Sequence, residues 1–311
     1  MKILIEVPTW LGDCVMATPA IENIVKEYPN VQITIFGSFV STSIFKEHPN
    51  VEEIIIDESK KSTPRLLWLY KKAKSLGKFD ASISFRRTFS SKLFIFSTAA
   101  KIKGYYKRYE KEEVHQVIRY NDFTKTVLSL KSAPSDLKIY MKPFKYEKPT
   151  LGINPGASYG SAKRWYPEKF VEVAIELSAQ YDIVIFGGPA EVDIANDIEK
   201  GLVEANVLNY SNIAGKTSIK ELCEKIGGLD LFITGDSGPM HVAAAFKVPT
   251  VAIFGPTKDK ETSQWHNPNS SIVKREMDCA PCMKRTCPLK HHECMKLIET
   301  SDILTAVKEL K

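Results

Sequence analysis

The 311-residue chain lacks any long apolar run. No stretch approaches the ~20 consecutive apolar residues that cross a bilayer. The chain opens directly on a strand-like segment, Lys2-Ile3-Leu4-Ile5-Glu6-Val7, so no signal peptide is expected. Repeats of fixed period and low-complexity tracts are absent as well. We therefore expect a globular protein of the cytoplasm, whose contact with any membrane is peripheral.

Cysteine is scarce and unevenly placed. Of the six cysteines, those at positions 14 and 223 stand alone and the other four form a cluster with two histidines. The cluster consists of Cys279, Cys282, Cys287, His291, His292 and Cys294. Because the cytoplasm keeps thiols reduced, structural disulfides are not expected. The Cys-x-x-Cys pair with two further thiols resembles a tetrahedral zinc set, but its spacings match no standard zinc ribbon or knuckle. Reduced structural or redox-sensitive thiols are the alternative.

Acidic residues are few in the first half of the chain. Residues 1–148 hold 25 Lys and Arg against 16 Asp and Glu, a net charge of +9, whereas residues 149–311 carry −3. A basic half favours an anionic partner such as nucleic acid, a phosphorylated lipid or a membrane surface. Ordinary solvated lysines are the alternative, and nucleic acid is disfavoured because no aromatic stacking platform or recognisable binding motif accompanies the charge.

Apolar, β-rich runs alternate with helical patterns along the chain. Strands are predicted at 2–7, 32–36, 53–56, 81–85, 151–154, 183–186, 207–210, 231–234 and 250–254. Helical patterns lie at 18–28, 42–47, 64–76, 167–180, 190–205, 219–226 and 240–246. This βαβ order predicts parallel, doubly wound sheets.

The chain is long enough for two domains. A Lys- and Pro-rich stretch at 141–149 reads as the linker between them, because proline continues neither a helix nor a central strand. We predict an α/β fold of two Rossmann-like domains, 1–147 and 148–311, facing a cleft. Ligands of such sheets bind beyond the carboxyl ends of the strands, so the loops at those ends hold the candidate site.

The most informative loop is Gly235-Asp236-Ser237-Gly238-Pro239-Met240-His241. It joins an apolar strand to a helix, which directs backbone N–H groups and a helix dipole at one point, as a phosphate site requires. An acidic acceptor and a switchable histidine donor accompany them. The alternative is a capped helix, with Asp236 or Ser237 as N-cap and Pro239 in the first turn.

The first strand ends in Pro8-Thr9-Trp10-Leu11-Gly12-Asp13. No Gly-x-Gly-x-x-Gly fingerprint occurs there, so dinucleotide binding is not supported. Asp13 opens the next helix, where a carboxylate could take a proton from an attacking hydroxyl. The alternative is an N-cap aspartate.

Two further strand ends carry groups compatible with a nucleotide. One is the segment Asn154-Pro155-Gly156-Ala157-Ser158, which leads to Lys163 and Arg164 just before a helix N-terminus. Cations at that end of a helix oppose the helix dipole, so the basic pair suggests a bound anion. The other is the segment Gly187-Gly188-Pro189-Ala190-Glu191. Its acidic side chain could accept hydrogen bonds from ribose hydroxyls, and the alternative is that it stabilises a helix N-terminus. Together the loops predict a nucleoside diphosphate site.

These motifs, in this order, resemble glycosyltransferase family 9, the ADP-heptose:lipopolysaccharide heptosyltransferases, and are most similar to the branch that adds the second heptose of the inner core. The resemblance covers essentially the whole chain. It rests on the loop ending at Asp13, the Asn154 loop with Ala162-Lys163-Arg164-Trp165, the Gly187 loop, and the segment from Asp236 to His241.

The resemblance implies a GT-B fold, with the acceptor on the first domain and the nucleotide sugar on the second. It implies an inverting transfer of L-glycero-D-manno-heptose from ADP-heptose to heptosyl-Kdo2-lipid A, with Asp13 as the general base. It also implies that Lys163 and Arg164 contact the donor phosphates, that Glu191 holds the ribose and that Asp236 binds heptose hydroxyls. The donor-binding set as a whole is Ser158, Lys163, Arg164, Gly188, Glu191, Asp236, Ser237, Gly238, Pro239, Met240 and His241.

The acceptor, anionic through Kdo carboxylates and lipid A phosphates, suits the basic first half. Its expected contacts are Trp10, Arg86 and Arg87, with Lys92, Lys101, Lys103, Lys107 and Arg108 as further cations. No cofactor is expected to be required, zinc at the cysteines being the open exception. The enzyme is expected in the cytoplasm, at the inner-membrane face, with its last helix, 302–310, returning to the first domain. A family 9 transferase for another sugar or for the first heptose, and a non-catalytic nucleotide-sugar-binding protein, are the alternatives.

Overall fold

The computed structural model describes residues 1–108 and 112–310. Its chain divides into two compact units, Met1–Met141 and Lys142–Lys311, each built on a parallel sheet. Within the described residues, no helix is both long and apolar enough to cross a membrane.

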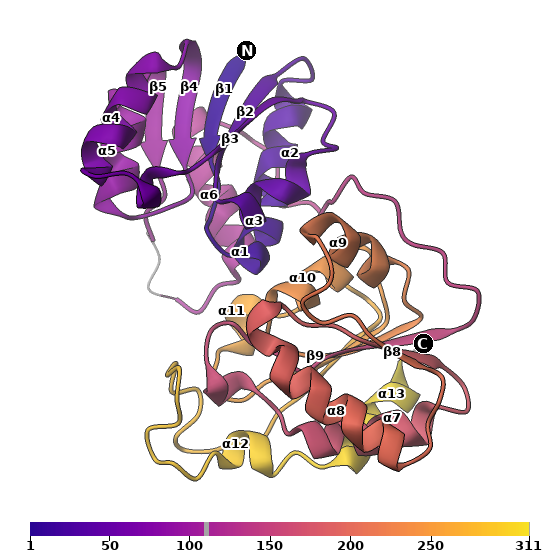
Figure 1. Cartoon of the computed structure of the whole chain (residues 1–311). Helices are drawn as coiled ribbons and strands as arrows, with labels where there is room; N and C mark the ends of the chain where they lie inside the picture. The colour runs from indigo at the N-terminus through magenta and orange to yellow at the C-terminus, as the bar shows by residue number, and fades with distance from the viewer. Residues whose placement is uncertain (109–111, 311) are drawn as a thin grey trace. The chain divides into compact units, whose positions relative to one another are not determined.

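The first unit has five parallel strands in the order β3-β2-β1-β4-β5, which Figure 1 shows in its upper half. They are β1 (Lys2–Glu6), β2 (Gln32–Gly37), β3 (Val51–Ile56), β4 (Lys78–Ser84) and β5 (Ala99–Tyr105). The connecting helices are α1 (Leu11–Met16), α2 (Thr18–Glu27), α3 (Phe39–Thr42), η1 (Ser43–Phe45), η2 (Ser59–Lys61), α4 (Arg65–Ser75), α5 (Phe89–Ser97) and α6 (Gln116–Leu128). Strand order reverses beside β1, as in a doubly wound sheet.

The second unit has six parallel strands in the order β11-β10-β9-β6-β7-β8, and this order too reverses beside its first strand. They are β6 (Thr150–Asn154), β7 (Asp182–Ile185), β8 (Tyr210–Asn212), β9 (Leu231–Gly235), β10 (Thr250–Ile253) and β11 (Ser270–Val273). The helices are η3 (Ser161–Lys163), α7 (Pro167–Leu177), η4 (Pro189–Glu191), α8 (Val192–Glu204), α9 (Ile219–Gly227), α10 (Gly238–Ala245), α11 (Asp259–Thr262), α12 (Glu293–Lys296) and α13 (Thr300–Glu309).

The inner strands are almost wholly buried and mostly apolar, as in parallel sheets that helices cover on both faces. In the second unit, β6, β7, β9 and β10 pack with α7, α8 and α13 into one hydrophobic core. The resemblance suggested that the last helix returns to the first domain. Within the second unit, Ile303 and Ala306 of α13 are buried in this core, and Figure 1 shows α13 beside α7, while its return to the first domain stays a prediction.

The predicted linker is anchored to the second unit rather than free. The Phe144 amide donates to the Glu224 carbonyl at 2.7 Å, and the Tyr146 hydroxyl donates to the Lys225 carbonyl at 3.2 Å. The Lys225 ammonium lies 4.2 Å from the centre of the Phe144 ring. These contacts tie the stretch after Met141 to α9.

Candidate active site

A buried carboxylate, Asp236, is the centre of the site in the second unit. It follows β9 and is 6 % exposed. The Lys163 Nζ atom lies 2.5 Å from Asp236 Oδ2, and the Thr257 hydroxyl donates to the same oxygen at 2.6 Å. A buried carboxylate needs such partners because water no longer solvates its charge. The loop ends that carry Asp236 and Lys163 therefore come together, as their strand-end positions predicted.

Thr257 is a residue that the sequence reasoning missed. It lies beyond β10, in Gly255-Pro256-Thr257, and is 7 % exposed. The signal was present, because this segment is one more loop of small residues at a carboxyl strand end. Its hydroxyl holds the Asp236 carboxylate from the side of β10, while Lys163 holds it from η3.

Glu191 is held in a fixed orientation next to the Gly156 turn. One carboxylate oxygen accepts the Gly188 amide at 2.7 Å, and the other accepts the Ser158 hydroxyl at 3.4 Å. A Cβ atom on Gly156 would lie 2.2 Å from Glu191 Cδ, so only glycine allows this approach. The structure thus brings together three predicted donor-binding residues, Ser158, Gly188 and Glu191.

A polar seam joins the ends of β6 and β9. The Asn154 side-chain amide donates to the Thr234 hydroxyl at 3.2 Å and to the Ser237 hydroxyl at 3.3 Å. Ser237 is the N-cap of α10, with Pro239 in its first turn, and His241 follows with 3 % exposure. The loop joins a strand to a helix, as both interpretations required, and Ser237 occupies the N-cap position of the alternative without a side-chain capping hydrogen bond.

Met240 is one residue of the predicted donor-binding set. Its side chain is fully buried in a small core with Ala252 and Phe254. A helix turns each successive side chain by about 100°, so this apolar side chain points into the unit. A contact of Met240 with the donor therefore stays a prediction for its backbone and not for its buried side chain.

Arg164 follows η3 and is partly buried. Its Nε atom is buried and, among the described residues, has no hydrogen-bond partner. A buried donor of this kind favours an acceptor supplied by a ligand or water.

In the first unit, Asp13 lies in the first turn of α1 and is partly exposed. The N-cap of this helix is Trp10, so Asp13 does not occupy the cap position that the alternative interpretation gave it. Burial raises the pKa of the Cys14 thiol and of the Tyr120 phenol well above their usual values, and the Asp13 carboxylate raises both further. Asp13 therefore lies near these two neutral side chains.

Arg86 was predicted as an acceptor contact, but its side chain is turned inward. Its Nη1 atom lies 3.2 Å from Glu6 Oε1 and 3.4 Å from Asp57 Oδ2, and its Nε donates to the Val7 carbonyl at 2.9 Å. The side chain is only 12 % exposed. Arg86 thus links the ends of β1, β3 and β4 instead of offering its donors to solvent.

The two other predicted acceptor contacts are open to solvent. Trp10 is 51 % exposed, and Arg87 is exposed directly after its inward-turned neighbour. Both follow carboxyl strand ends, Trp10 after β1 and Arg87 after β4. They remain available to a ligand.

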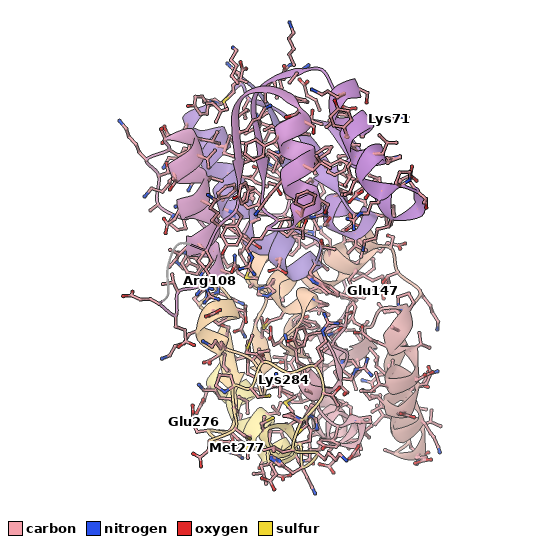
Figure 2. All side chains as sticks on the ribbon, turned by 90° about the vertical axis from the view of Figure 1, so that its left-hand side faces the viewer. Lys71, Arg108, Glu147, Glu276, Met277 and Lys284 are labelled. Atoms are coloured by element: carbon pink, nitrogen blue, oxygen red, sulfur yellow. The ribbon has the colours of Figure 1, made fainter. Side chains whose placement is uncertain are left out.

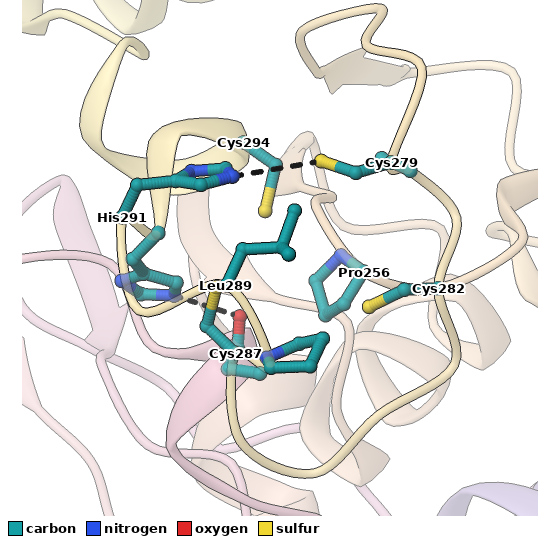
Figure 3. A pocket seen from close by; sticks show the side chains of 11 residues that line it. Pro256, Cys279, Cys282, Cys287, Leu289, His291 and Cys294 are labelled. Carbon is teal, nitrogen blue, oxygen red and sulfur yellow. Dashed lines mark hydrogen bonds between the residues drawn. The ribbon is translucent and has the colours of Figure 1, made fainter.

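The four clustered cysteines line a single pocket, with Pro256, Leu289 and His291 among the other residues around it (Figure 3). The four cysteines are free thiols, and Cys279 Sγ lies 4.0 Å from His291 Nε2. Burial and the three neighbouring thiols raise the pKa of Cys294 to about 11. In residues 1–108 and 112–310, no three His, Cys, Asp or Glu side chains are grouped as a bound metal ion would require.

A family model described as glycosyltransferase family 9 (heptosyltransferase) matches residues 96–293. The chain is also 46 % identical to the lipooligosaccharide heptosyltransferase 2 of Campylobacter jejuni serotype O:2, over 100 % of this chain and 98 % of that protein. The chain belongs to glycosyltransferase family 9. It is therefore an enzyme of the heptosyltransferase family, as the motifs predicted.

Solved structures of this family confirm the predicted GT-B fold. The ADP-heptose lipopolysaccharide heptosyltransferase II of Escherichia coli superimposes with a TM-score of 0.80 at 22 % identity, covering 99 % of this chain and 98 % of that one. An E. coli heptosyltransferase solved with ADP gives 0.80 at 15 % identity, covering 99 % of each chain. At these identities the likeness establishes the fold alone.

Proposed function

We propose that this family 9 enzyme transfers L-glycero-D-manno-heptose from ADP-heptose to the heptosyl-Kdo2-lipid A inner core, with inversion at the anomeric carbon. The end-to-end similarity to the Campylobacter lipooligosaccharide heptosyltransferase 2 carries this proposal. The site geometry supports it, because the buried Asp236, the partly buried Lys163 and the Glu191 carboxylate lie in loops that follow neighbouring strands of the second unit.

On the donor side, each of these groups has a task suited to its chemistry. Glu191 accepts hydrogen bonds from the ribose hydroxyls, in an orientation fixed by the Gly188 amide. Lys163 and Arg164 bind the diphosphate, and Asp236 accepts from heptose hydroxyls. The Ser237–Gly238–Pro239 turn and His241 contribute donors at the start of α10.

In the proposed reaction, Asp13 takes the proton of an acceptor hydroxyl as its oxygen attacks the anomeric carbon of the heptose. The bond from that carbon to the diphosphate breaks on the opposite face, and ADP leaves with the electron pair. The negative charge that develops on ADP is stabilised by Lys163, by His241 and by backbone N–H groups. A carboxylate suits the role of base because it is ionised at neutral pH.

On the acceptor side, we propose that the exposed Trp10 and Arg87 contact the anionic lipid saccharide. The positive charge of the first 148 residues favours this partner and a peripheral contact with the cytoplasmic face of the inner membrane. Zinc at the four cysteines stays an open prediction, since thiols are suitable ligands but are not gathered into a site.

The test is a transfer assay with ADP-heptose and heptosyl-Kdo2-lipid A, in which mass spectrometry of the acceptor detects the added heptose. Wild-type enzyme is expected to add one heptose, and Asp13→Asn to lower kcat by about 10²–10⁴-fold, the usual contribution of a general base. The affinity for ADP should stay within about twofold, because Asp13 lies in the other unit from the donor-binding residues.

Two outcomes would contradict the proposal in different ways. Normal turnover by Asp13→Asn would remove this residue as the base while leaving the reaction in place. Absence of heptose transfer by the wild-type enzyme, with ADP still bound, would leave the family and the nucleotide site standing. The assay would then move to the Kdo2-lipid A acceptor and to other nucleotide sugars.

A further inference from the structure

The cysteine-bearing loop that follows β11 lies beside the turn that precedes Lys163. Its backbone is fastened to the turn that precedes Lys163. The Ala162 amide donates to the Arg285 carbonyl at 3.0 Å, and the Tyr159 hydroxyl donates to the Met283 carbonyl at 2.8 Å. Arg285 is therefore held beside the donor-binding turn although 122 residues separate it from Lys163 in the chain.

Gly160 explains how the two segments approach so closely. Its φ of +159° lies at the edge of the region that favours glycine, and a Cβ atom there would lie 2.3 Å from the Arg285 carbonyl oxygen. A residue with a side chain would push the loop away. The backbone position of Arg285 is thus set by a contact that only glycine allows.

The Arg285 side chain reaches toward the same ring as Lys163 does. Its guanidinium carbon lies 5.4 Å from the centre of the Tyr159 ring, and Lys163 Nζ lies 4.8 Å from it. Both distances are typical of cation–π contacts. Two cations from distant segments therefore gather around one aromatic ring at the edge of the site.

Of the two cations around the Tyr159 ring, Lys163 has an acidic partner and Arg285 has none among the described residues. The Lys163 charge is already matched by Asp236 at 2.5 Å. Arg285 is exposed and, among the described residues, forms no ion pair. A nucleoside diphosphate brings at least two negative charges, and of the two cations already proposed to bind it, Lys163 is shared with the Asp236 carboxylate.

We propose that Arg285 binds the diphosphate of the nucleotide donor, as a further cation beside Lys163 and Arg164. This inference deepens the proposed function and rests on its assignment of the donor to this site. A guanidinium suits the role because its planar donors grip two phosphate oxygens at once. The Tyr159 ring holds it in place before the ligand arrives, which lowers the entropy lost on binding.

The adjacent Lys284 provides a matched control. It is exposed, carries the same charge and lies on the same loop (Figure 2), but it has no contact with Tyr159 among the cation–π pairs of the described residues. A general effect of the charge of the loop would appear equally in both variants. A specific contact with phosphate would appear only at Arg285.

The experiment measures binding of ADP, AMP and adenosine to the wild-type enzyme and to Arg285→Ala, Arg285→Lys and Lys284→Ala by calorimetry. Arg285→Ala is expected to weaken ADP binding by about 10–100-fold, the range for a charge-assisted hydrogen bond. Adenosine binding should be unchanged, Arg285→Lys should recover part of the loss, and Lys284→Ala should stay within about twofold.

Equal ADP affinity in wild type and Arg285→Ala would overturn the inference. So would an equal loss for adenosine, which would mean a collapsed loop, and a thermal melt of each variant checks this independently. If the wild-type enzyme prefers another nucleoside diphosphate to ADP, the proposed donor is wrong. The same comparison made with the preferred diphosphate then tests Arg285 by itself.

Discussion

At the scale of single residues, Glu6 shows how the first unit tolerates a buried acid. It is 2 % exposed at the end of β1. The Ser84 hydroxyl donates to one carboxylate oxygen at 2.5 Å, the Ser91 hydroxyl donates to the other at 2.9 Å, and Arg86 lies 3.2 Å away. Burial nevertheless outweighs these partners and raises the pKa of Glu6 above 4.5.

This raised pKa predicts a pH-dependent stability. A group whose pKa is raised by folding stabilises the folded state most below its unfolded-state pKa, and this contribution is lost as the pH rises through the folded-state value. Glu6→Gln removes the titration. The free energy of unfolding of wild type minus that of Glu6→Gln should therefore fall as the pH rises above about 4.5, the ordinary value for the group.

Urea denaturation of both proteins at a series of pH values measures this difference, in which the titrations of other groups largely cancel. Glu47→Gln, a change at an exposed acid of the same unit, gives the background for removing one carboxylate. A difference that stays constant or grows with pH would show that Arg86 and the hydroxyls outweigh burial.

Residue roles could be predicted from the sequence where chemistry coincides with a strand end. Asp13, Lys163, Glu191 and Asp236 follow apolar runs, so their places at the carboxyl edges of the sheets could be deduced. The position of Arg285 could not, because a hydrogen-bonded contact between distant loops brings it beside the turn that precedes Lys163. The inward turn of Arg86 toward Glu6 and Asp57 could not be predicted either, because the sequence does not show which acids lie beside it.

At the scale of elements, the turn after β6 depends on the absence of a side chain. A Cβ atom on Gly156 would collide with Cδ of Glu191, the residue that ends η4 and is the N-cap of α8. Gly156→Ala should displace the Glu191 carboxylate from the Gly188 amide and raise the KM for ADP-heptose about tenfold, the loss of one charged hydrogen bond. Asp13 is untouched, so the pH profile of kcat should not change.

Gly77→Ala is the control for this prediction, because nothing lies within 4 Å of the added methyl group. Steady-state kinetics on both variants decide it. An unchanged KM in Gly156→Ala would mean that Glu191 can shift without loss, and hence that it does not hold the nucleotide.

Elements were predictable where their pattern was strong and internal to the sheet. The almost wholly buried strands could be recognised by their mostly apolar sequences; they are β1, β2, β6, β9 and β10. The edge strands were harder to recognise. β5 carries two lysines in a half-exposed edge, and β11 begins with two serines, so neither was predicted.

Two helices of the first unit were missed for different reasons. α5 contains three serines spread among apolar residues, so it lacks one clear apolar face. α6 buries Asn121 and Thr124 beside its apolar residues, and Asn121 accepts a hydrogen bond from Asn23 of α2 at 2.6 Å. Buried polar residues of this kind blur the helical pattern that sequence reasoning relies on.

At the scale of the whole molecule, charge separates the two proposed substrates. The excess of +9 lies in residues 1–148, where the lipid acceptor is proposed to bind, whereas the donor-binding residues belong to the second unit. Many of the basic side chains are exposed, while the Lys163 side chain is only 12 % exposed. Salt screens exposed charges far more than buried ones.

Ionic strength should therefore affect the two substrates unequally. When NaCl is raised from about 0.05 to about 0.3 M, the Debye length falls from roughly 14 to 6 Å, so the KM for heptosyl-Kdo2-lipid A should rise several-fold. The KM for ADP-heptose should rise less, because Lys163 is only 12 % exposed and Arg285 is the one exposed cation among those proposed to bind the donor.

Initial rates are measured with each substrate varied in turn at five salt concentrations. They give, for each substrate, the slope of log KM against log salt concentration. An acceptor whose lipid A phosphates have been removed should show a smaller change of KM with salt than the intact acceptor, since it offers fewer negative charges to the basic residues 1–148. Equal slopes for donor and acceptor would contradict the argument, because the positive charge of residues 1–148 would then play no part in recruiting the acceptor. A steeper slope for the donor would place the decisive exposed cations around the nucleotide instead.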